Sequence, residues 1–130
     1  TSGPAIPPQA AALAAIRHPY DPAMRDELAR KRDLIRREAA AIPEIVVWPT
    51  PATFYTFWDV RPLFGKRTPE GARLATSDDV AEYLIRAAGV VTAPGSAFMQ
   101  DGYLRLSFAT PDEEIVKGMR AAAAAVQALS

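Results

Sequence analysis

Apolar residues recur along most of this chain with the spacings of helices and strands. The first pattern is a short alanine-rich helix over residues 9–17, which Pro7-Pro8 introduces and His18-Pro19 stops. A longer helix is predicted from Asp21-Pro22 to about Ala41, because an aspartate followed by proline is a typical helix start. Its apolar face is formed by Met24, Leu28, Leu34, Ile35, Ala39 and Ile42.

The polar faces of this second helix carry a run of bases that resembles a nucleic-acid patch. The basic residues are Arg25, Arg30, Lys31, Arg32, Arg36 and Arg37. Acidic residues stand among them at helical spacing, namely Asp26, Glu27, Asp33 and Glu38. The pattern therefore favours a solvated, ion-paired face.

Strand patterns follow the second helix. Residues 44–48 and 53–60 are rich in β-branched and aromatic side chains, and the prolines between them predict two neighbouring strands. Residues 61–75 have the proline and glycine content of a loop. Thr76-Ser77-Asp78-Asp79 then starts a helix that ends at Gly89.

The remaining pattern predicts two strands and a final helix. Residues 90–92 form a short strand before the Pro94-Gly95 turn, and residues 103–109 form a second strand. Thr110-Pro111-Asp112-Glu113 has the pattern of a capping box that opens the last helix. The stripe of this helix that packs on the sheet is Ile115, Met119, Ala122, Val126 and Leu129. Together these elements predict an α+β fold, a small and mostly antiparallel sheet with helices packed on it.

Composition excludes several classes of protein. The 130 residues suffice for one domain, and the 15 basic residues balance the 15 acidic ones, which argues against nucleic-acid and membrane partners. No cysteine is present and the one histidine is His18, so a zinc site or a Ser-His-Asp triad lacks ligands or bases, and we expect no metal. No apolar run reaches the roughly 18 residues of a membrane span, and we expect a cytoplasmic protein.

Arg105 stands inside an otherwise apolar strand pattern. The period of two places Tyr103, Arg105, Ser107 and Ala109 on one face, and Leu104, Leu106 and Phe108 on the other. A guanidinium keeps its charge and offers its donors in a planar fork. On a half-buried strand it either pairs with a carboxylate of the protein, the commoner arrangement, or awaits the carboxylate of a ligand. The residues by themselves leave both alternatives open.

The segment around Arg105 resembles the C-terminal end of the fold type I pyridoxal-phosphate-dependent aminotransferases of class I and II. The matching residues are Pro94, Gly95, Phe98, Gly102, Arg105, Ser107 and Ala109. Residues 51–57 resemble the family motif Pro-x-Gly-Thr/Ala-Phe-Tyr-x-Phe, with Ala52 in place of the usual glycine. Thr1-Ser2-Gly3-Pro4 resembles the Thr-Ser-Asn-Pro loop at the family's dimer interface, with Gly3 in place of asparagine.

The resemblance implies a division of the chain and a role for its arginine. Residues 21–130 correspond to the C-terminal small domain, and residues 1–20 belong to the end of a large domain that the sequence lacks. Arg105 then binds the substrate α-carboxylate. Pyridoxal phosphate is the cofactor of the intact enzyme, which acts as a homodimer on amino acids and 2-oxo acids. Residues 60–66 with Ser77 and Tyr83 resemble the bacterial aspartate aminotransferases, which suggests aspartate as a substrate.

The lysine that the family uses to form a Schiff base has no counterpart in this sequence. Lys31, Lys66 and Lys117 lie outside the serine-rich strand end where the family's lysine lies, and each is predicted to be a surface charge. We therefore expect no catalytic and no cofactor-binding residue in this chain, which alone should be inactive. The competing hypothesis is a free-standing, non-catalytic α+β binding module in which Arg105 belongs to a structural ion pair.

Overall fold

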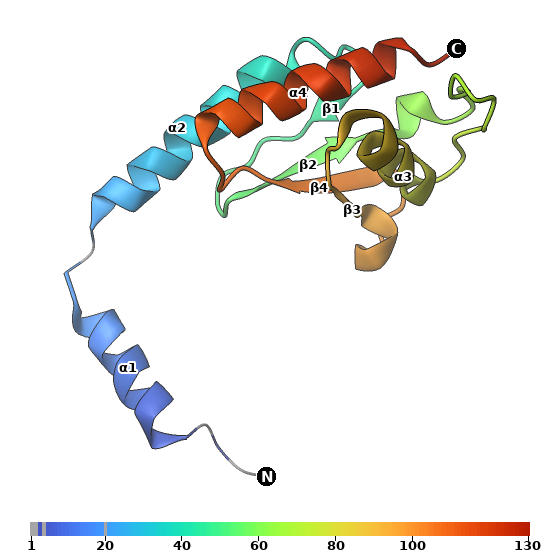
Figure 1. Ribbon diagram of the computed structural model, residues 1–130. Helices are drawn as coiled ribbons and strands as arrows, with labels where there is room; N and C mark the ends of the chain where they lie inside the picture. Colours follow the sequence, from blue (N-terminus) through green and yellow to red (C-terminus); the bar gives the residue numbers. More distant parts are fainter. Residues whose placement is uncertain (1–2, 4, 20) are drawn as a thin grey trace.

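The computed structural model describes residues 3, 5–19 and 21–130, and it has the predicted order of helices and strands (Figure 1). The elements are α1 (Ile6–Arg17), α2 (Pro22–Ala39), β1 (Val46–Val47), β2 (Tyr55–Asp59), α3 (Ser77–Ala88), β3 (Ala93–Pro94), β4 (Tyr103–Ser107) and α4 (Asp112–Gln127). Two short 3-10 turns, η1 (Arg61–Leu63) and η2 (Gly95–Phe98), lie in the connections. The predicted α+β fold is confirmed.

The strands form one antiparallel sheet in the order β1-β2-β4-β3. In the central pair of strands Phe57 lies opposite Arg105, and Asp59 lies opposite Tyr103. Ala93 of β3 flanks Arg105 on its other side. Because opposite residues share a face, the register gathers aromatic and charged side chains on one side of the sheet.

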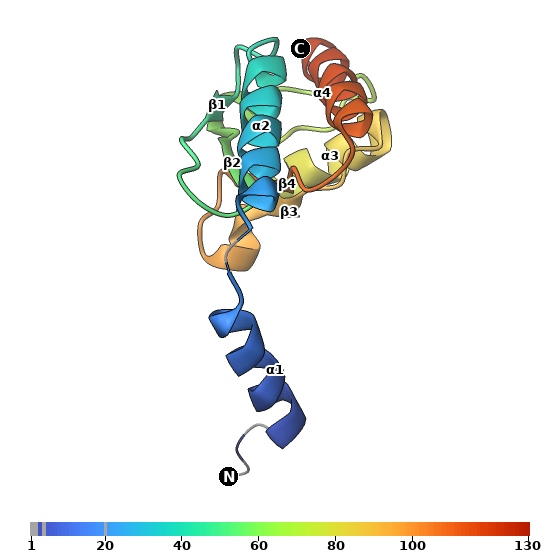
Figure 2. The same cartoon turned by 90° about the vertical axis from the view of Figure 1, so that its left-hand side faces the viewer.

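The other side of the sheet is packed against the helices. Trp58 and Leu104 are fully buried there, in one core with residues from α2, α3 and α4. The predicted stripe of the last helix is buried too, and α4 lies against α2 and α3 (Figures 1 and 2). One-sided burial fixes the strand register, since a slip of one residue would turn Leu104 outward and Arg105 into the core.

Two predicted strand positions are wrong in detail. The strand expected at residues 44–48 is shorter, Val46–Val47, with one further backbone bond from the amide of Trp48 to the carbonyl of Phe57, and the strand expected at residues 90–92 lies instead at Ala93–Pro94. The reason for the second shift is the end of α3. Gly89 adopts a left-handed conformation, and the amide of Val90 donates to the carbonyl of Leu84, so this residue belongs to the helix cap.

Two further helix predictions also need correction. Met24, expected on the apolar face of α2, is 74% exposed, because the residues of that face that pack against the core begin at Leu28. The capping box expected at the start of α4 is absent. Pro111 occupies the N-cap without a side-chain hydrogen bond, and its carbonyl accepts from the amides of Glu114 and Ile115.

Helix α1 begins at Ile6, earlier than predicted, and is separate from the rest of the fold in both views (Figures 1 and 2). None of its residues is buried, and Ile6 and Ile16 are each 81% exposed. His18 forms its C-cap, as expected from its position before proline. The predicted dimer-interface motif falls on Thr1, Ser2 and Pro4, which lie outside the described residues.

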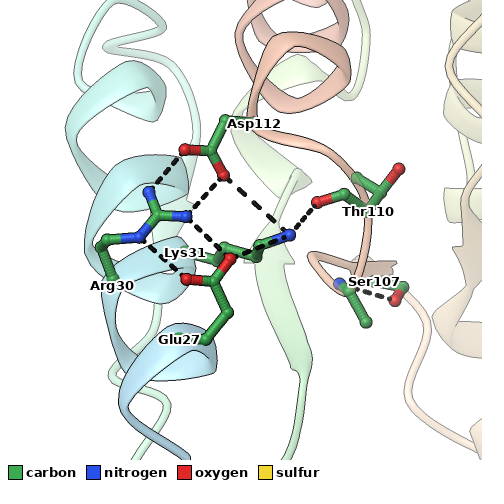
Figure 3. Close-up of polar contacts among 7 residues, drawn as sticks. Glu27, Arg30, Lys31, Ser107, Thr110 and Asp112 are labelled. Atoms are coloured by element: carbon green, nitrogen blue, oxygen red, sulfur yellow. Dashed lines mark hydrogen bonds and ion pairs between the residues drawn. The ribbon is translucent and has the colours of Figure 1, made fainter. Parts of the chain in front are cut away.

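A cluster of four charged side chains joins α2 to the start of α4 (Figure 3). Arg30 donates to both Glu27 and Asp112, and these bonds lower the pKa of each carboxyl group. Lys31 donates to the carbonyl of Thr110 at 2.6 Å and lies 3.4 Å from Glu27. The ion-paired face predicted for α2 is confirmed. The prediction that Lys31 is a surface charge is wrong, because its side chain reaches between two elements and is only 14% exposed.

We expect Lys31→Met to lower the free energy of unfolding by about 1–2 kcal/mol, because it leaves the Thr110 carbonyl without its charged donor. Arg32→Met is the matched control, since Arg32 contacts only its neighbour Asp33 among the ion pairs of the described residues. That control should change stability by less than about 0.5 kcal/mol. Urea unfolding of the two variants provides the comparison, and equal small losses would show that the Lys31 contact contributes nothing.

Candidate functional site

The candidate site lies on the face of the sheet that the helices leave open. Arg105 is half-buried there, between the fully buried Leu104 and the buried Leu106 on the opposite face. The alternation predicted for this strand is therefore confirmed. The side chain of Arg105 is brought to the open face by the same register that buries its neighbours.

The guanidinium of Arg105 contacts two aromatic rings. Its central carbon is 4.4 Å from the ring centre of Tyr55 and 4.4 Å from that of Phe98. Stacking of this kind uses the flat faces of the guanidinium and leaves its N–H donors at the edge of the plane. The contacts limit the positions that the guanidinium can take, and within the described residues no side-chain hydrogen bond occupies its donors.

Arg105 takes part in none of the ion pairs formed within residues 3, 5–19 and 21–130. The structural ion pair considered for Arg105 is thus not seen in the described part of the chain. Arg61, which lies on the same side of the sheet, is different. Asp59 accepts from its Nε at 2.9 Å and from its backbone amide at 3.1 Å, and these bonds lower the pKa of Asp59.

Aromatic side chains connect the two arginines across the open face. Phe57 lies 6.5 Å from Phe98 in an edge-on arrangement and 5.7 Å from Tyr103, measured between ring centres. The guanidinium of Arg61 lies 5.2 Å from the centre of the Tyr103 ring. We call Tyr55, Phe57, Phe98 and Tyr103 the aromatic strip. Its side chains make an apolar wall beside the edge donors of Arg105.

Residues 95–102 form a tight loop that carries Phe98. A side chain on Gly95 would place its Cβ 1.9 Å from the carbonyl oxygen of Gln100, so only glycine fits. The amide of Gln100 donates to the carbonyl of Gly95 at 2.9 Å and closes the loop. Met99 at its tip is 97% exposed and has φ +58°. The predicted Pro94-Gly95 turn is thus the junction between β3 and η2.

Asp101 attaches this loop to α3. Its carboxylate accepts from the backbone amide of Ser77 at 2.8 Å and from the Ser77 hydroxyl at 2.5 Å. These bonds lower the pKa of Asp101. Sequence reasoning did not single out Asp101, because the contact joins residues 24 positions apart and no local pattern reports it.

The position of Tyr55 depends on a strained residue. Thr53 has φ +71°, an unusual value for a β-branched residue, and it directly follows Ala52, which replaces the family's glycine. The Thr53 hydroxyl accepts from the amide of Tyr55 at 3.1 Å. This bond keeps the turn that delivers Tyr55 to the guanidinium of Arg105.

The described residues contain no grouping of histidine and acidic side chains suited to a metal ion. The searched part of the chain also holds no helix long and apolar enough to cross a membrane. Of the lysines, Lys31 is engaged with Thr110, and Lys117 is an exposed residue 3.9 Å from Glu114. Neither arrangement leaves an amine poised beside Arg105 for chemistry with a carbonyl group.

Comparison with known proteins identifies relatives of this chain. Residues 2–122 match the family model "Aminotransferase class I and II". The chain is 36% identical over 132 residues to an aspartate aminotransferase of Rhizobium meliloti (strain 1021), covering 100% of the chain and 32% of that protein. It is 36% identical over 119 residues to a probable aspartate/prephenate aminotransferase of Rickettsia conorii, covering 90% of the chain and 30% of the relative.

Solved structures agree with the sequence matches. The crystal structure of the Rhizobium meliloti aspartate aminotransferase superposes with a TM-score of 0.85 at 35% identity, covering 94% of this chain and 31% of the other. An aromatic aminotransferase from Pyrococcus horikoshii gives a TM-score of 0.69 at 27% identity, over 81% and 26% of the two chains. The chain thus spans about a third of the length of the relatives it matches.

The bond between Asp101 and Ser77 should make stability dependent on pH. An aspartate whose folded-state pKa is lowered stabilises the fold fully above its unfolded-state pKa, about 3.9, and loses this contribution as the pH falls through the lower value. We expect Asp101→Asn to destabilise the chain by a constant amount at pH 5–7 and by progressively less below about pH 4. Urea unfolding across this range measures the difference.

Asp78→Asn is the matched control for this pH series. Asp78 lies next to Ser77 in the first turn of α3, but no side-chain hydrogen bond or ion pair of Asp78 occurs within the described residues. Its replacement should leave a much smaller pH-dependent difference than that of Asp101. Identical profiles for the two variants would mean that the Asp101–Ser77 bond does not form in solution.

Proposed function

Because this chain belongs to the class I and II aminotransferases, we propose that it serves as their substrate-clamping C-terminal small domain, with Arg105 binding the α-carboxylate of the substrate. The observation that carries the proposal is the position of the guanidinium, stacked between Tyr55 and Phe98 with no acidic partner in the described part of the chain. A charged group held in this way supplies a ready site for a carboxylate.

The fork of Arg105 gives both affinity and orientation. Two parallel N–H···O bonds hold a carboxylate in the plane of the guanidinium, so the substrate Cα takes a defined position relative to the sheet. Such positioning contributes to catalysis by placing the Cα–H bond for proton removal. The aromatic strip supports this role, because its apolar surface limits the water that competes for the same donors.

The proposed substrates are an amino acid and a 2-oxo acid. Aspartate is the favoured amino acid, because the relatives with high identity are aspartate or aspartate/prephenate aminotransferases. The residue that would bind a second carboxylate of aspartate is not assigned in this chain. Arg61 is a poor candidate for that task, since Asp59 already occupies its Nε and one terminal nitrogen.

The cofactor of the intact enzyme is, we propose, pyridoxal phosphate held by the part of the protein that this chain does not include. Pyridoxal phosphate withdraws electrons from the substrate Cα when bound. Two of the three lysines support this proposal, because Lys31 is tied to Thr110 and Lys117 is exposed on α4. The contribution of this chain is therefore to bind and orient the substrate.

Residues 1–20 are proposed to belong to the large domain of the intact enzyme, and residues 21–130 to the small domain. The exposed apolar side chains of α1 support this division, since Ile6 and Ile16 have no covering surface in the described part of the chain. A homodimeric intact enzyme in the cytoplasm is part of the same proposal. The alternative of a free-standing binding module is less well supported, because the ion pair that it expects at Arg105 is not seen in the part of the chain that the structure describes.

We expect replacement of Arg105 by leucine in the full-length protein to lower kcat/KM on the order of a hundredfold or more. Arg105→Lys should recover only part of this loss, because lysine restores the charge without the fork. Thermal unfolding should change little in either variant. Arg61→Lys is the matched control, and it should affect stability more than kcat/KM, since the donors of Arg61 serve Asp59. Normal turnover with a large loss of stability in the Arg105 variants would assign this arginine a structural role.

The second expectation concerns the 130-residue chain by itself. Added pyridoxal phosphate should produce no lysine-bound absorbance band, and borohydride treatment should fix no stoichiometric adduct on Lys31, Lys66 or Lys117. The reason is that the proposal assigns the cofactor site to the part of the protein that this chain does not include. Absorbance spectra and mass spectrometry provide the test. A specific one-to-one adduct would contradict the proposal that the cofactor binds to a part of the protein outside this chain.

A further inference from the structure

Phe98 covers one face of Arg105, and it reaches that position on a loop that has little freedom of its own. The ring centre of Phe98 lies 4.4 Å from the guanidinium carbon, although the residue itself is 42% exposed. Close packing at Gly95 and the bond from Gln100 to Gly95 hold residues 95–102 as one compact unit. The position of Phe98 is therefore set by the attachments of this unit to the rest of the fold.

Two attachments fix the C-terminal end of the loop. The carbonyl of Gly102 accepts from the amide of Val60 at 2.9 Å, which ties the loop to the end of β2. The carboxylate of Asp101 accepts two hydrogen bonds from Ser77, which is fully buried in the first turn of α3. The first attachment is a backbone bond next to the sheet. The second depends on a single side chain and crosses to a different layer of the fold.

We propose that Asp101 is a positioning residue for the carboxylate clamp, because its bonds to Ser77 hold the loop that keeps Phe98 stacked on Arg105. This inference rests on the proposed function of Arg105. Asp101 itself contacts neither Arg105 nor the aromatic strip in the described residues. It acts through the loop, and the quantity it controls is the orientation of the guanidinium.

The physical reason is the conformational freedom of arginine. An arginine side chain has several rotatable bonds, so its guanidinium can take many orientations. If the free protein populates many of them, a carboxylate that needs one orientation binds more weakly. Contacts with the rings of Tyr55 and Phe98 restrict the positions that the guanidinium can take. When the loop moves, the guanidinium loses its contact with Phe98. The substrate carboxylate must then restrict the orientation of the guanidinium as it binds. The expected result is weaker substrate binding with a smaller effect on the chemical step.

A suitable comparison within the same helix start is provided by Asp79. Its carboxylate accepts from the amides of Thr76 and Ala75 at 2.9 and 2.8 Å, so it also caps α3. It has no bond to residues 95–102 among the described contacts. Asp79→Ala therefore reproduces the damage to the helix start without releasing the loop of Phe98.

The experiment compares Asp101→Ala, Asp79→Ala and Arg105→Lys in the full-length, cofactor-loaded enzyme. For Asp101→Ala we expect KM for the amino acid to rise about tenfold, with kcat reduced less than about threefold. The dissociation constant of maleate, a simple dicarboxylate probe, should rise by a similar factor. Asp79→Ala should lower the thermal midpoint comparably and leave both constants within about twofold of the parent. If Asp101→Ala does not fold, Ser77→Ala removes one of the two bonds and should give a smaller rise in KM.

A double-mutant cycle tests the route through Phe98. In a Phe98→Leu background the ring is already missing, so adding Asp101→Ala should change KM by less than about twofold. Independent, multiplying effects of the two substitutions would overturn the inference. So would equal effects of Asp101→Ala and Asp79→Ala while Arg105→Lys still lowers kcat/KM, and in that case the proposed function stands. Unchanged kcat/KM in Arg105→Lys would instead overturn the proposed function itself.

Discussion

The charge of Arg105 is the constraint on which the open face of the sheet depends. A guanidinium cannot be neutralised by losing its proton, so a strand that buries one face must keep the charge on the other. The protein meets this requirement with two aromatic contacts, since the guanidinium carbon lies 4.4 Å from the ring centres of both Tyr55 and Phe98. The result is a cation held by aromatic contacts, with no ion pair within the described residues.

The core sets this arrangement from the opposite side of the sheet. Trp58 and Leu104 are fully buried on neighbouring strands, and their burial fixes the pairing that puts Phe57 beside Arg105. Helices α2 and α4 close this core. Lys31 ties α2 to the carbonyl of Thr110 in the turn between β4 and α4, and Arg30 ties it to Asp112 at the start of α4. Strand β4, which carries Arg105, is thus held by its pairing in the sheet and by the contact of Lys31 with Thr110 just after the strand.

Periodicity predicted the elements and their order because each one buries a regular stripe or face. The stripe of α4 and the alternation of β4 are local properties, and both are confirmed. The errors fall where tertiary contacts replace local ones. Thr110 offered a capping pattern, but its carbonyl is the one that Lys31 reaches. Asp101 had no local pattern at all, since its partner Ser77 is brought near only by the packing of α3 beside the sheet. The role of Arg105 came from resemblance to a family, and the strand pattern alone left its partner undecided.

The exposed tip of the 95–102 loop makes its position accessible to spectroscopy. Met99 is 97% exposed and its backbone caps η2, while Phe98 beside it contacts the arginine. The sequence contains no cysteine, so a single cysteine introduced at position 99 would be the only thiol of this chain. A spin label or fluorophore attached there would sit one residue from the ring that flanks the guanidinium. Movement of that ring can then be followed by a signal that does not depend on turnover.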